Sequence, residues 1–275
     1  MLLFVAFVIT LFTMPYFRYN LIDYGNDLKT YDIKKKVVSE DQVIISLTTI
    51  PERLPTIGKT LQSLLRQTVE INIEVNLPKK CLVSDKPYTI PEAWQGLQRL
   101  QFIEVEKDYG PSTKLLPTLK RHSPDTIIVV VDDDRIYEPH LVERLVEKLK
   151  EGKGEYAVTS SGWNWKEGRY NVKNENVSKR EPIKKVDVLR GVEGYALYVH
   201  QIDSAIFNYD NVSNACIRMD DVWISHHVKD IRIVYFPEKI HYPPNSISWE
   251  TSAVLKNVSN SRADLNNECY TYLLK

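Results

Sequence analysis

Three consecutive carboxylates, Asp132, Asp133 and Asp134, are the residues of this sequence best suited to chemistry. They directly follow residues 126–131, a continuous strand-forming run of the kind found where both faces of a parallel sheet are covered. Like charges this close repel one another unless protons or a cation relieve them, and oxygen ligands of this type suit Mg²⁺ or Mn²⁺. The pattern predicts a divalent metal site that could also bind a diphosphate, and a solvated acidic turn is the alternative.

Lys114 is a second candidate for binding an anion. It follows the Gly-Pro turn at residues 110–111 and stands where a helix is predicted to begin. The positive end of a helix and an ammonium group together suit phosphate or ribose oxygens. An ordinary surface lysine is the alternative.

Two tryptophans and one glutamate are candidates for contact with a sugar or an acceptor. Trp163 and Trp165 follow a predicted strand, and their faces could pack on the C–H surface of a sugar or in the core. Glu193 lies between Gly191 and Gly194, where the backbone could approach a ligand closely. Glycines at an ordinary bend are the alternative to that interpretation.

The elements that must position these residues alternate between strands and helices. Strands are predicted from β-branched and alternating patterns, and helices from apolar residues at helical spacing. This order predicts an α/β fold with a mostly parallel, doubly wound sheet and helices on both faces, which binds ligands at the carboxyl ends of its strands. The predicted strands are 43–47, 71–77, 101–105, 126–131, 156–159, 186–189 and 231–236; the helices are 55–67, 112–119, 139–150, 203–209 and 220–229, and the tail after residue 243 has no strong periodicity.

The first residues differ in character from the rest. Residues 1–18 are almost wholly apolar up to Arg18, which predicts a signal anchor or signal peptide, and the lack of a good cleavage site at 13–16 favours the anchor. Residues 19–41 are polar and predict a stem, so the folded domain would occupy 42–275. Three Asn-Val-Ser sequons fit a type II membrane protein with a Golgi-like lumenal domain. A cytoplasmic, membrane-associated protein is the alternative if the chain is encoded by a virus.

Composition excludes several classes of function. The chain has 36 basic and 36 acidic residues, so no overall field attracts nucleic acid. It contains neither the glycine pattern of dinucleotide-binding enzymes nor a Walker lysine loop. Its cysteines, Cys81, Cys216 and Cys269, are odd in number and far apart, which favours buried free thiols.

Four segments, taken in this order, resemble the GT-A glycosyltransferases, and most closely their exostosin-like and chlorovirus-type domains. The aspartate triplet matches the Asp-x-Asp motif that ends a central strand in those enzymes. The matching segments are residues 46–53, 109–115, 130–134 and 220–223. The resemblance implies the GT-A fold, also called the nucleotide-diphospho-sugar transferase fold, over most of the chain beyond the predicted anchor.

The same resemblance implies a donor site after the first strand and the central strand. Thr48, Thr49 and Arg53 would line the nucleotide pocket with Lys114, although Arg53 could instead be an exposed loop charge. Asp132 would contact ribose or base, and Asp133 the metal or the sugar.

The metal and the proton transfer are assigned by the resemblance as well. Asp134 and Asp132 would bind the metal, and His241 would complete the site, unless it is a structural histidine. Asp221, with Asp220 as second choice, would be the general base that takes the proton of the acceptor hydroxyl. The alternative for both aspartates is capping of the helix that follows. Related retaining enzymes also carry an aspartate here, so the stereochemistry stays open.

The expected function is therefore transfer of a hexosyl or pentosyl group from a nucleotide sugar, UDP-linked by first choice, to a glycan or glycoprotein acceptor, with Mn²⁺ or Mg²⁺ as cofactor. A nucleotidyltransferase that makes nucleotide sugars is the nearest rival, but it would need a glycine-rich, basic loop after the first strand, which residues 48–51 do not provide. A noncatalytic carbohydrate-binding domain is the third interpretation.

Overall fold

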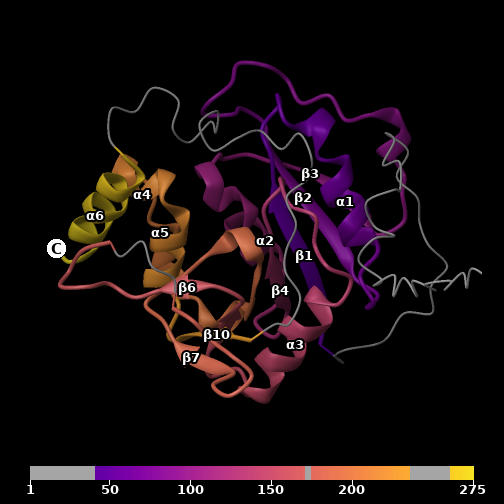
Figure 1. Cartoon of the computed structure of the whole chain (residues 1–275). Coiled ribbons are helices and arrows are strands. Elements are labelled where there is room, and N and C mark those ends of the chain that lie inside the picture. Colours follow the sequence, from indigo (N-terminus) through magenta and orange to yellow (C-terminus); the bar gives the residue numbers. More distant parts are fainter. Residues whose placement is uncertain (1–40, 171–174, 236–260) are drawn as a thin grey trace, which may run out of the picture.

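Eight strands form the central sheet in the order β3-β2-β1-β4-β9-β5-β10-β7, in a computed structural model that describes residues 41–170, 175–235 and 261–275 (Figure 1). β1 pairs in parallel with β2 and β4, β2 with β3, and β5 with β10, while β9 and β7 run antiparallel to their neighbours. The predicted α/β class and mostly parallel sheet are confirmed. The strands are β1 Val43–Thr48, β2 Asn72–Pro78, β3 Leu100–Val105, β4 Ile127–Val130, β5 Ala157–Thr159, β7 Ile183–Lys185, β9 Tyr195–Tyr198 and β10 Ile231–Val234; β6 Gly162–Trp163 and β8 Val188–Leu189 form a separate pair.

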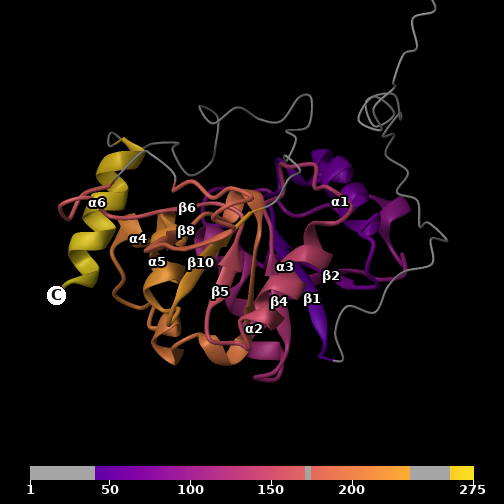
Figure 2. The same cartoon turned by 60° about the horizontal axis from the view of Figure 1, so that its bottom comes forward.

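Helices cover both faces of the sheet, as predicted (Figures 1 and 2). Side chains of β4 alternate between the faces: Ile127 and Val129 pack in one apolar cluster, and Ile128 and Val130 pack in the other. The first cluster contains the apolar sides of α1 (Gly58–Leu65) and α3 (Leu141–Glu151), and the second contains those of α2 (Leu116–Arg121), α5 (Asp220–His226) and α6 (Arg262–Leu273). β4 is thus buried on both sides, which is why its sequence is continuously apolar.

Three predicted helices differ from the structure in their bounds or type. The helix predicted over 55–67 begins as a 3-10 turn, Leu54–Thr56, before α1. The helix predicted over 112–119 is split into the 3-10 helix η4 (Gly110–Lys114) and α2, because Pro117 is accommodated only in the first turn of an α-helix. The segment predicted as a helix over 203–209 is a 3-10 helix, Ser204–Phe207.

Helix α6 was not predicted, because the tail lacks a visible apolar period. The buried face of α6 consists of Leu265, Asn266 and Cys269, so a polar residue interrupts the stripe. A local signal does exist at its start. The Ser261 hydroxyl accepts a hydrogen bond from the Asp264 amide at 3.2 Å, and the Asp264 carboxylate accepts one from the Ser261 amide at 3.0 Å, which is a capping box.

The prediction of free thiols is wrong for two of the three cysteines. Cys216 and Cys269 form a disulfide, with 4.7 Å between their Cα atoms, whereas Cys81 is a free, buried thiol. The sequence gives no signal for this pair, because 53 residues separate the partners and only packing of α6 brings them together.

The predicted anchor and stem lie almost wholly outside the described residues and remain predictions. Within residues 41–170, 175–235 and 261–275, no helix has both the length and the apolar character needed to cross a bilayer.

A buried polar network connects β2 to the helix pair that carries Lys114. Glu74 is 5% exposed, forms an ion pair with Arg121 and lies within hydrogen-bonding distance, 2.8 Å, of His122 Nε2. The Thr118 hydroxyl donates to Glu74 at 3.2 Å and contacts the Ser46 hydroxyl at 2.7 Å. Ser46 in turn donates to the Lys114 carbonyl oxygen at 2.6 Å. The backbone of Lys114 is therefore held by the interior of the sheet.

Substitution Glu74→Ala should lower the free energy of unfolding by about 2 kcal/mol, below the ~3–5 kcal/mol of fully buried pairs, because Arg121 is partly exposed. Urea unfolding measures the change. Glu106→Ala is the control, since the Glu106 side chain is 82% exposed in its pair with Lys79. Equal unfolding midpoints for the two variants would contradict a structural role for Glu74.

Candidate active site

A cavity of about 410 Å³ opens where β1 and β4 end. The two strands are parallel, and Ser46 lies opposite Val130 in their register, so the residues that follow both strands meet at one edge of the sheet. Loops and helices from the second half of the chain complete the wall. Its predicted lining residues are Thr48, Thr49, Arg53, Lys114, Asp132, Asp133, Asp134, Asp220 and Asp221.

The protein's own cations neutralise the aspartate triplet. Asp132 forms an ion pair with Lys114 at 2.7 Å. Asp134 lies 3.1 Å from Arg53 and 2.6 Å from Arg135. Although burial opposes ionisation of Asp132, the charge and hydrogen bond of Lys114 outweigh it and lower the pKa of that carboxyl. These partners relieve the repulsion that the sequence predicts.

Asp133 is the structural member of the triplet. Its side chain is 8% exposed, forms an ion pair with Arg53 and accepts a hydrogen bond from the Thr49 hydroxyl at 2.5 Å. Burial, against the opposing effects of Arg53 and Thr49, raises the pKa of Asp133 to about 6. Thr60 donates to its carbonyl oxygen at 2.9 Å. Thr49 and Arg53 thus fix the loop after β1 to the triplet, and Arg53 is not a loop charge without a partner.

Asp132 and Asp134 remain accessible to a ligand. Their side chains are 26% and 22% exposed, in contrast to Asp133. The Tyr137 hydroxyl accepts a hydrogen bond from the Asp132 amide at 2.8 Å, which holds the turn in place. The triplet therefore presents its first and third carboxylates to the cavity.

Lys114 connects the triplet to the second acidic pair. Its ammonium lies 2.7 Å from Asp132 and 2.8 Å from Asp220, and only 5% of the residue is exposed. Burial disfavours the ammonium, but the charges of Asp132 and Asp220 outweigh it and raise the pKa of Lys114 well above its ordinary value. Lys114 is therefore a fixed positive charge between the two groups of acids, and not a surface lysine.

Asp221 has the pKa that a general base requires. Burial, followed by repulsion from Asp220, raises its pKa to about 7. Its Oδ1 accepts a hydrogen bond from the Gly191 amide at 2.9 Å. A Cβ at residue 191 would lie 2.8 Å from the Lys114 ammonium and 3.2 Å from Asp221 Oδ1, so a larger residue here would displace these two groups.

Several lining residues were not singled out in the sequence. Asp108 accepts hydrogen bonds from the amides of Leu82 and Gly110, each at 2.7 Å, and so joins two loops that line the cavity. Tyr88 donates to the Thr49 carbonyl oxygen at 2.9 Å. No local motif marks these residues, because long connections bring them together. The wall also contains Arg190, Arg218 and Arg262.

Three predicted contacts with sugar or acceptor do not line this cavity. Trp163 is buried and packs edge-to-face on Trp165 and Tyr170, with centroids 4.5 and 4.7 Å apart. Trp165 stacks at 4.0 Å on Tyr270 of α6. Both tryptophans pack the β6–β8 pair and the chain after it against α6, which is the packing role that the sequence also allowed.

Glu193 is also directed elsewhere. Its neighbour Val192 lines the cavity, whereas Glu193 does not. The Glu193 carbonyl oxygen accepts a hydrogen bond from the Ser160 hydroxyl at 3.1 Å. Gly194 has a φ of 84°, a conformation that favours glycine at this bend. His241 lies outside the described residues.

The described residues fit a small divalent cation in part. Among them, no three histidine, cysteine, aspartate or glutamate side chains converge. Mg²⁺ keeps several waters and substrate phosphate oxygens, so one or two protein carboxylates are enough to hold it. Asp132 and Asp134 have the right oxygen chemistry and the right exposure for that type of site.

Comparison with known families decides the class of protein. Residues 47–207, more than half of the chain, match the family described as Glycosyl transferase family 2. The chain belongs to this family. The match begins within β1 and includes the loop after it, Lys114 and the whole triplet, so a glycosyltransferase fold of the GT-A type accounts for the sheet described above. A search of curated proteins finds no match.

Solved structures similar to this family 2 chain include GalNAc-T7 with UDP, GalNAc and Mn²⁺, at 10% identity and a TM-score of 0.47, covering 70% of this chain and 41% of that one. Staphylococcus aureus TarS 1-349 in complex with UDP-GlcNAc is 11% identical, with a TM-score of 0.48 and coverage of 85% and 71%. CMP:2-keto-3-deoxy-manno-octonic acid synthetase with CTP is 14% identical, with a TM-score of 0.43 and coverage of 71% and 89%. Because these TM-scores are low, the assignment depends on the sequence match.

Proposed function

We propose that this glycosyl transferase family 2 protein moves a sugar from a nucleoside diphosphate sugar, UDP-linked by first choice, to a hydroxyl of a glycan or glycoprotein, with Mn²⁺ or Mg²⁺. One observation carries the proposal. The triplet and the Asp220–Asp221 pair line the same cavity, and Lys114 bridges them. A donor diphosphate at the triplet would thus lie beside a carboxylate able to take a proton.

Different residues of the chain would bind the donor and accept the proton. Thr48 and the loop held by Thr49 and Arg53 would bind the nucleotide after β1. A divalent ion held by Asp134 and Asp132 would neutralise the charge that develops on the leaving diphosphate. Lys114 adds a second, fixed positive charge beside it.

Asp221 is the proposed general base. Since the Gly191 amide occupies its Oδ1, Oδ2 is the oxygen expected to take the proton of the acceptor hydroxyl. The acceptor oxygen then bonds to the anomeric carbon while the bond from that carbon to the diphosphate breaks. Asp220, which is committed to Lys114, is the weaker candidate.

The rival functions differ in the product that they release. A glycosyltransferase incubated with UDP-sugars and Mn²⁺ releases UDP, by transfer or by slow hydrolysis. A nucleotidyltransferase would instead release pyrophosphate from a nucleoside triphosphate and a sugar phosphate, and a binding domain would release neither. Pyrophosphate as the product, or no turnover of any nucleotide sugar, would remove the proposal.

The pH dependence of transfer follows from Asp221. A carboxylate whose folded-state pKa is raised to about 7 is ionised, and able to accept a proton, only above that pH. The rate should therefore fall about tenfold for each pH unit below about 7. Initial rates at saturating donor between pH 5 and 9 measure this, and a rate that stays constant down to pH 5 would argue against Asp221 as the base.

We also propose that the catalytic domain lies in an oxidising, lumenal compartment, as a predicted type II anchor would place it. The Cys216–Cys269 disulfide supports this, because disulfides persist mainly in such compartments. Asn211, in one of the three sequons, is exposed. In a eukaryotic expression host, a glycosidase should therefore reduce the mass of the protein at Asn211, and an unmodified Asn211 would count against lumenal passage.

A further inference from the structure

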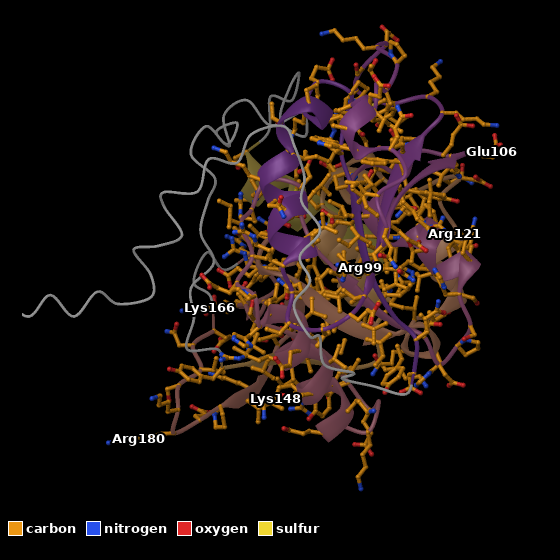
Figure 3. All side chains as sticks on the ribbon, turned by 90° about the vertical axis from the view of Figure 1, so that its right-hand side faces the viewer. Arg99, Glu106, Arg121, Lys148, Lys166 and Arg180 are labelled. Atoms are coloured by element: carbon orange, nitrogen blue, oxygen red, sulfur yellow. A yellow bond between two sulfur atoms is a disulfide. The ribbon has the colours of Figure 1, made fainter. Side chains whose placement is uncertain are left out.

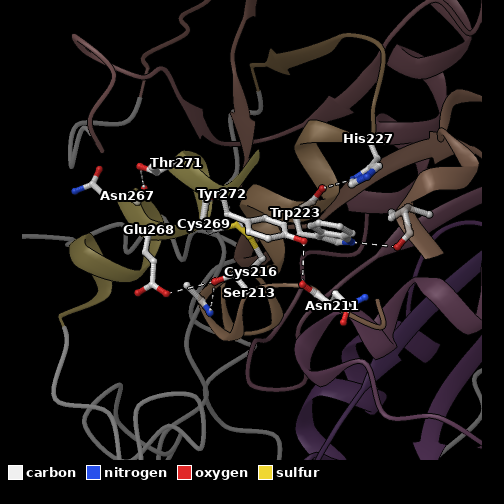
Figure 4. The surroundings of a disulfide bond; sticks show 12 residues. Asn211, Ser213, Cys216, Trp223, His227, Asn267, Glu268, Cys269, Thr271 and Tyr272 are labelled. Atoms are coloured by element: carbon white, nitrogen blue, oxygen red, sulfur yellow. Dashed lines mark hydrogen bonds between the residues drawn. A yellow bond between two sulfur atoms is a disulfide. The ribbon is translucent and has the colours of Figure 1, made fainter. Parts of the chain in front are cut away.

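Helix α6 is fastened to the catalytic part of the domain by a disulfide. Cys269 of α6 and Cys216 of α4 (Asn214–Arg218) are both fully buried (Figure 4). Around them, the Tyr272 hydroxyl donates to the Asn211 carbonyl oxygen at 3.0 Å (Figure 4). In both views of the fold, α6 lies at the edge of the domain opposite α1 (Figures 1 and 2).

The buried face of α6 leads from the disulfide to the cavity. Leu265 and Asn266 stand four and three residues before Cys269, and Arg262 stands one helical turn further towards the N-terminus, so all four share one side of the helix. Leu265, Asn266 and Cys269 are buried, and Arg262 lines the cavity. The disulfide thus holds the face of α6 whose first residue reaches the substrate site.

Helix α4 carries a second arginine to the same wall. Its Cys216 is turned into the core towards α6, while Asn214, Ile217 and Arg218 line the cavity. The other side of α4 touches the loop before Lys114. A Cβ on Gly110 would lie 2.9 Å from the Ile217 carbonyl oxygen, so little space separates α4 from η4. The disulfide therefore joins α6 to α4, a helix that packs closely against η4 and so lies near Lys114.

The cavity is lined by basic as well as acidic side chains. The carboxylates of the triplet are paired with Arg53, Lys114 and Arg135. Arg218 and Arg262 also line the cavity, and they lie on α4 and α6, the helices that precede and follow α5 and its Asp221 in the chain. A planar guanidinium matches the two oxygens of a phosphate or carboxylate.

We infer that Arg262, assisted by Arg218, binds an oxyanion of the substrate, and that the Cys216–Cys269 disulfide positions this arginine. The inference rests on the proposed function. The oxyanion belongs either to the diphosphate of the donor or to an acidic acceptor, and binding measurements separate these sources. Arg262 acts on substrate directly, whereas the disulfide acts through Arg262.

Substitution Arg262→Gln should weaken binding of one oxyanion probe by at least about tenfold, the loss expected for a charge-assisted hydrogen bond. The donor probe is UDP with Mn²⁺, and uridine, which lacks the diphosphate, is its reference. The acceptor probe is methyl β-glucuronide with UDP present, and methyl β-glucoside, which lacks the carboxylate, is its reference. Weaker UDP binding assigns the donor, and weaker glucuronide binding assigns the acceptor. Arg180→Gln is the control, since Arg180 is exposed at the periphery of the molecule (Figure 3). Unchanged binding of both probes by Arg262→Gln overturns the inference.

The role of the disulfide is tested by a cycle of variants. The double substitution Cys216→Ser with Cys269→Ser should weaken the same probe, and adding Arg262→Gln should weaken it no further. Losses that simply multiply would show that the disulfide does not act through Arg262. Should the double variant fail to fold, Arg262→Gln with an intact disulfide still decides the role of the arginine.

Failure of this inference can be distinguished from failure of the proposed function. If the wild-type protein turns over a nucleotide sugar while Arg262→Gln binds both probes normally, only this inference fails. If the wild type neither binds UDP nor turns over a donor, both fail.

Discussion

Replacing Asp134 with Asn is expected to lower kcat/KM for sugar transfer by about 10³-fold, because a ligand of the divalent cation is lost and several kcal/mol of charge stabilisation in the transition state go with it. The Asp134 carboxylate is partly exposed to the cavity, unlike that of Asp133. Asn keeps the shape of the side chain and one acceptor oxygen near Arg135, so the fold should persist. Initial rates with a UDP-sugar and Mn²⁺ give the comparison.

Two further variants make the Asp134 result specific. Asp210→Asn removes a carboxylate that is 93% exposed and pairs with Lys107, so its activity should equal that of the wild type. Asp133→Asn removes the partner of Arg53 and Thr49 inside the loop and should lower the thermal stability. Full activity of a folded Asp134→Asn protein would remove the metal role of the triplet.

Replacing Asp221 with Asn should reduce kcat by about 10²–10⁴-fold and leave donor binding nearly unchanged, because an amide cannot accept the proton. The substitution also removes a buried charge whose folded pKa is raised by desolvation and by Asp220. A raised carboxyl pKa contributes stability at low pH that is lost as pH rises through about 7. Asp221→Asn should therefore be at least as stable as the wild type at pH 8.

Asp220→Asn is the matched comparison for Asp221. Asp220 pairs with Lys114 at 2.8 Å, so its loss should affect donor binding as well as kcat. Because repulsion from Asp220 helps to raise the pKa of Asp221, the rate of Asp220→Asn should still fall at low pH, but the fall should begin at a lower pH than in the wild type. The assignment would be reversed if Asp220→Asn lost the pH dependence of the rate while Asp221→Asn kept it.

The central part of the fold could be predicted from the sequence because a strand that is buried on both faces consists of consecutive apolar residues. β4, which is covered on both sides, is continuously apolar, and α3 has a clear apolar stripe ending at Gly152. The second half is less regular. The short strands β6 and β7 and the polar-interrupted face of α6 have no periodicity long enough to detect, since their packing partners are distant in the chain.

The site was predictable to the same extent. Residues next to strand ends, such as Thr49 and Asp132, converge because parallel strands end at one edge. The partners of these residues could not be deduced, because ion pairs such as that of Lys114 with Asp220 depend on how α5 approaches the sheet. Arg262 and the disulfide were missed for the same reason: only the packed position of α6 places them.

Titration calorimetry of UDP into the purified protein, in Mn²⁺ and in excess EDTA, tests the central claim most directly. If a cation held at Asp132 and Asp134 binds the diphosphate, UDP should bind in Mn²⁺ and at least about tenfold more weakly in EDTA, and Asp134→Asn should respond little to Mn²⁺. Equal affinity for UDP with and without the metal, in both the wild type and Asp134→Asn, would contradict the claim.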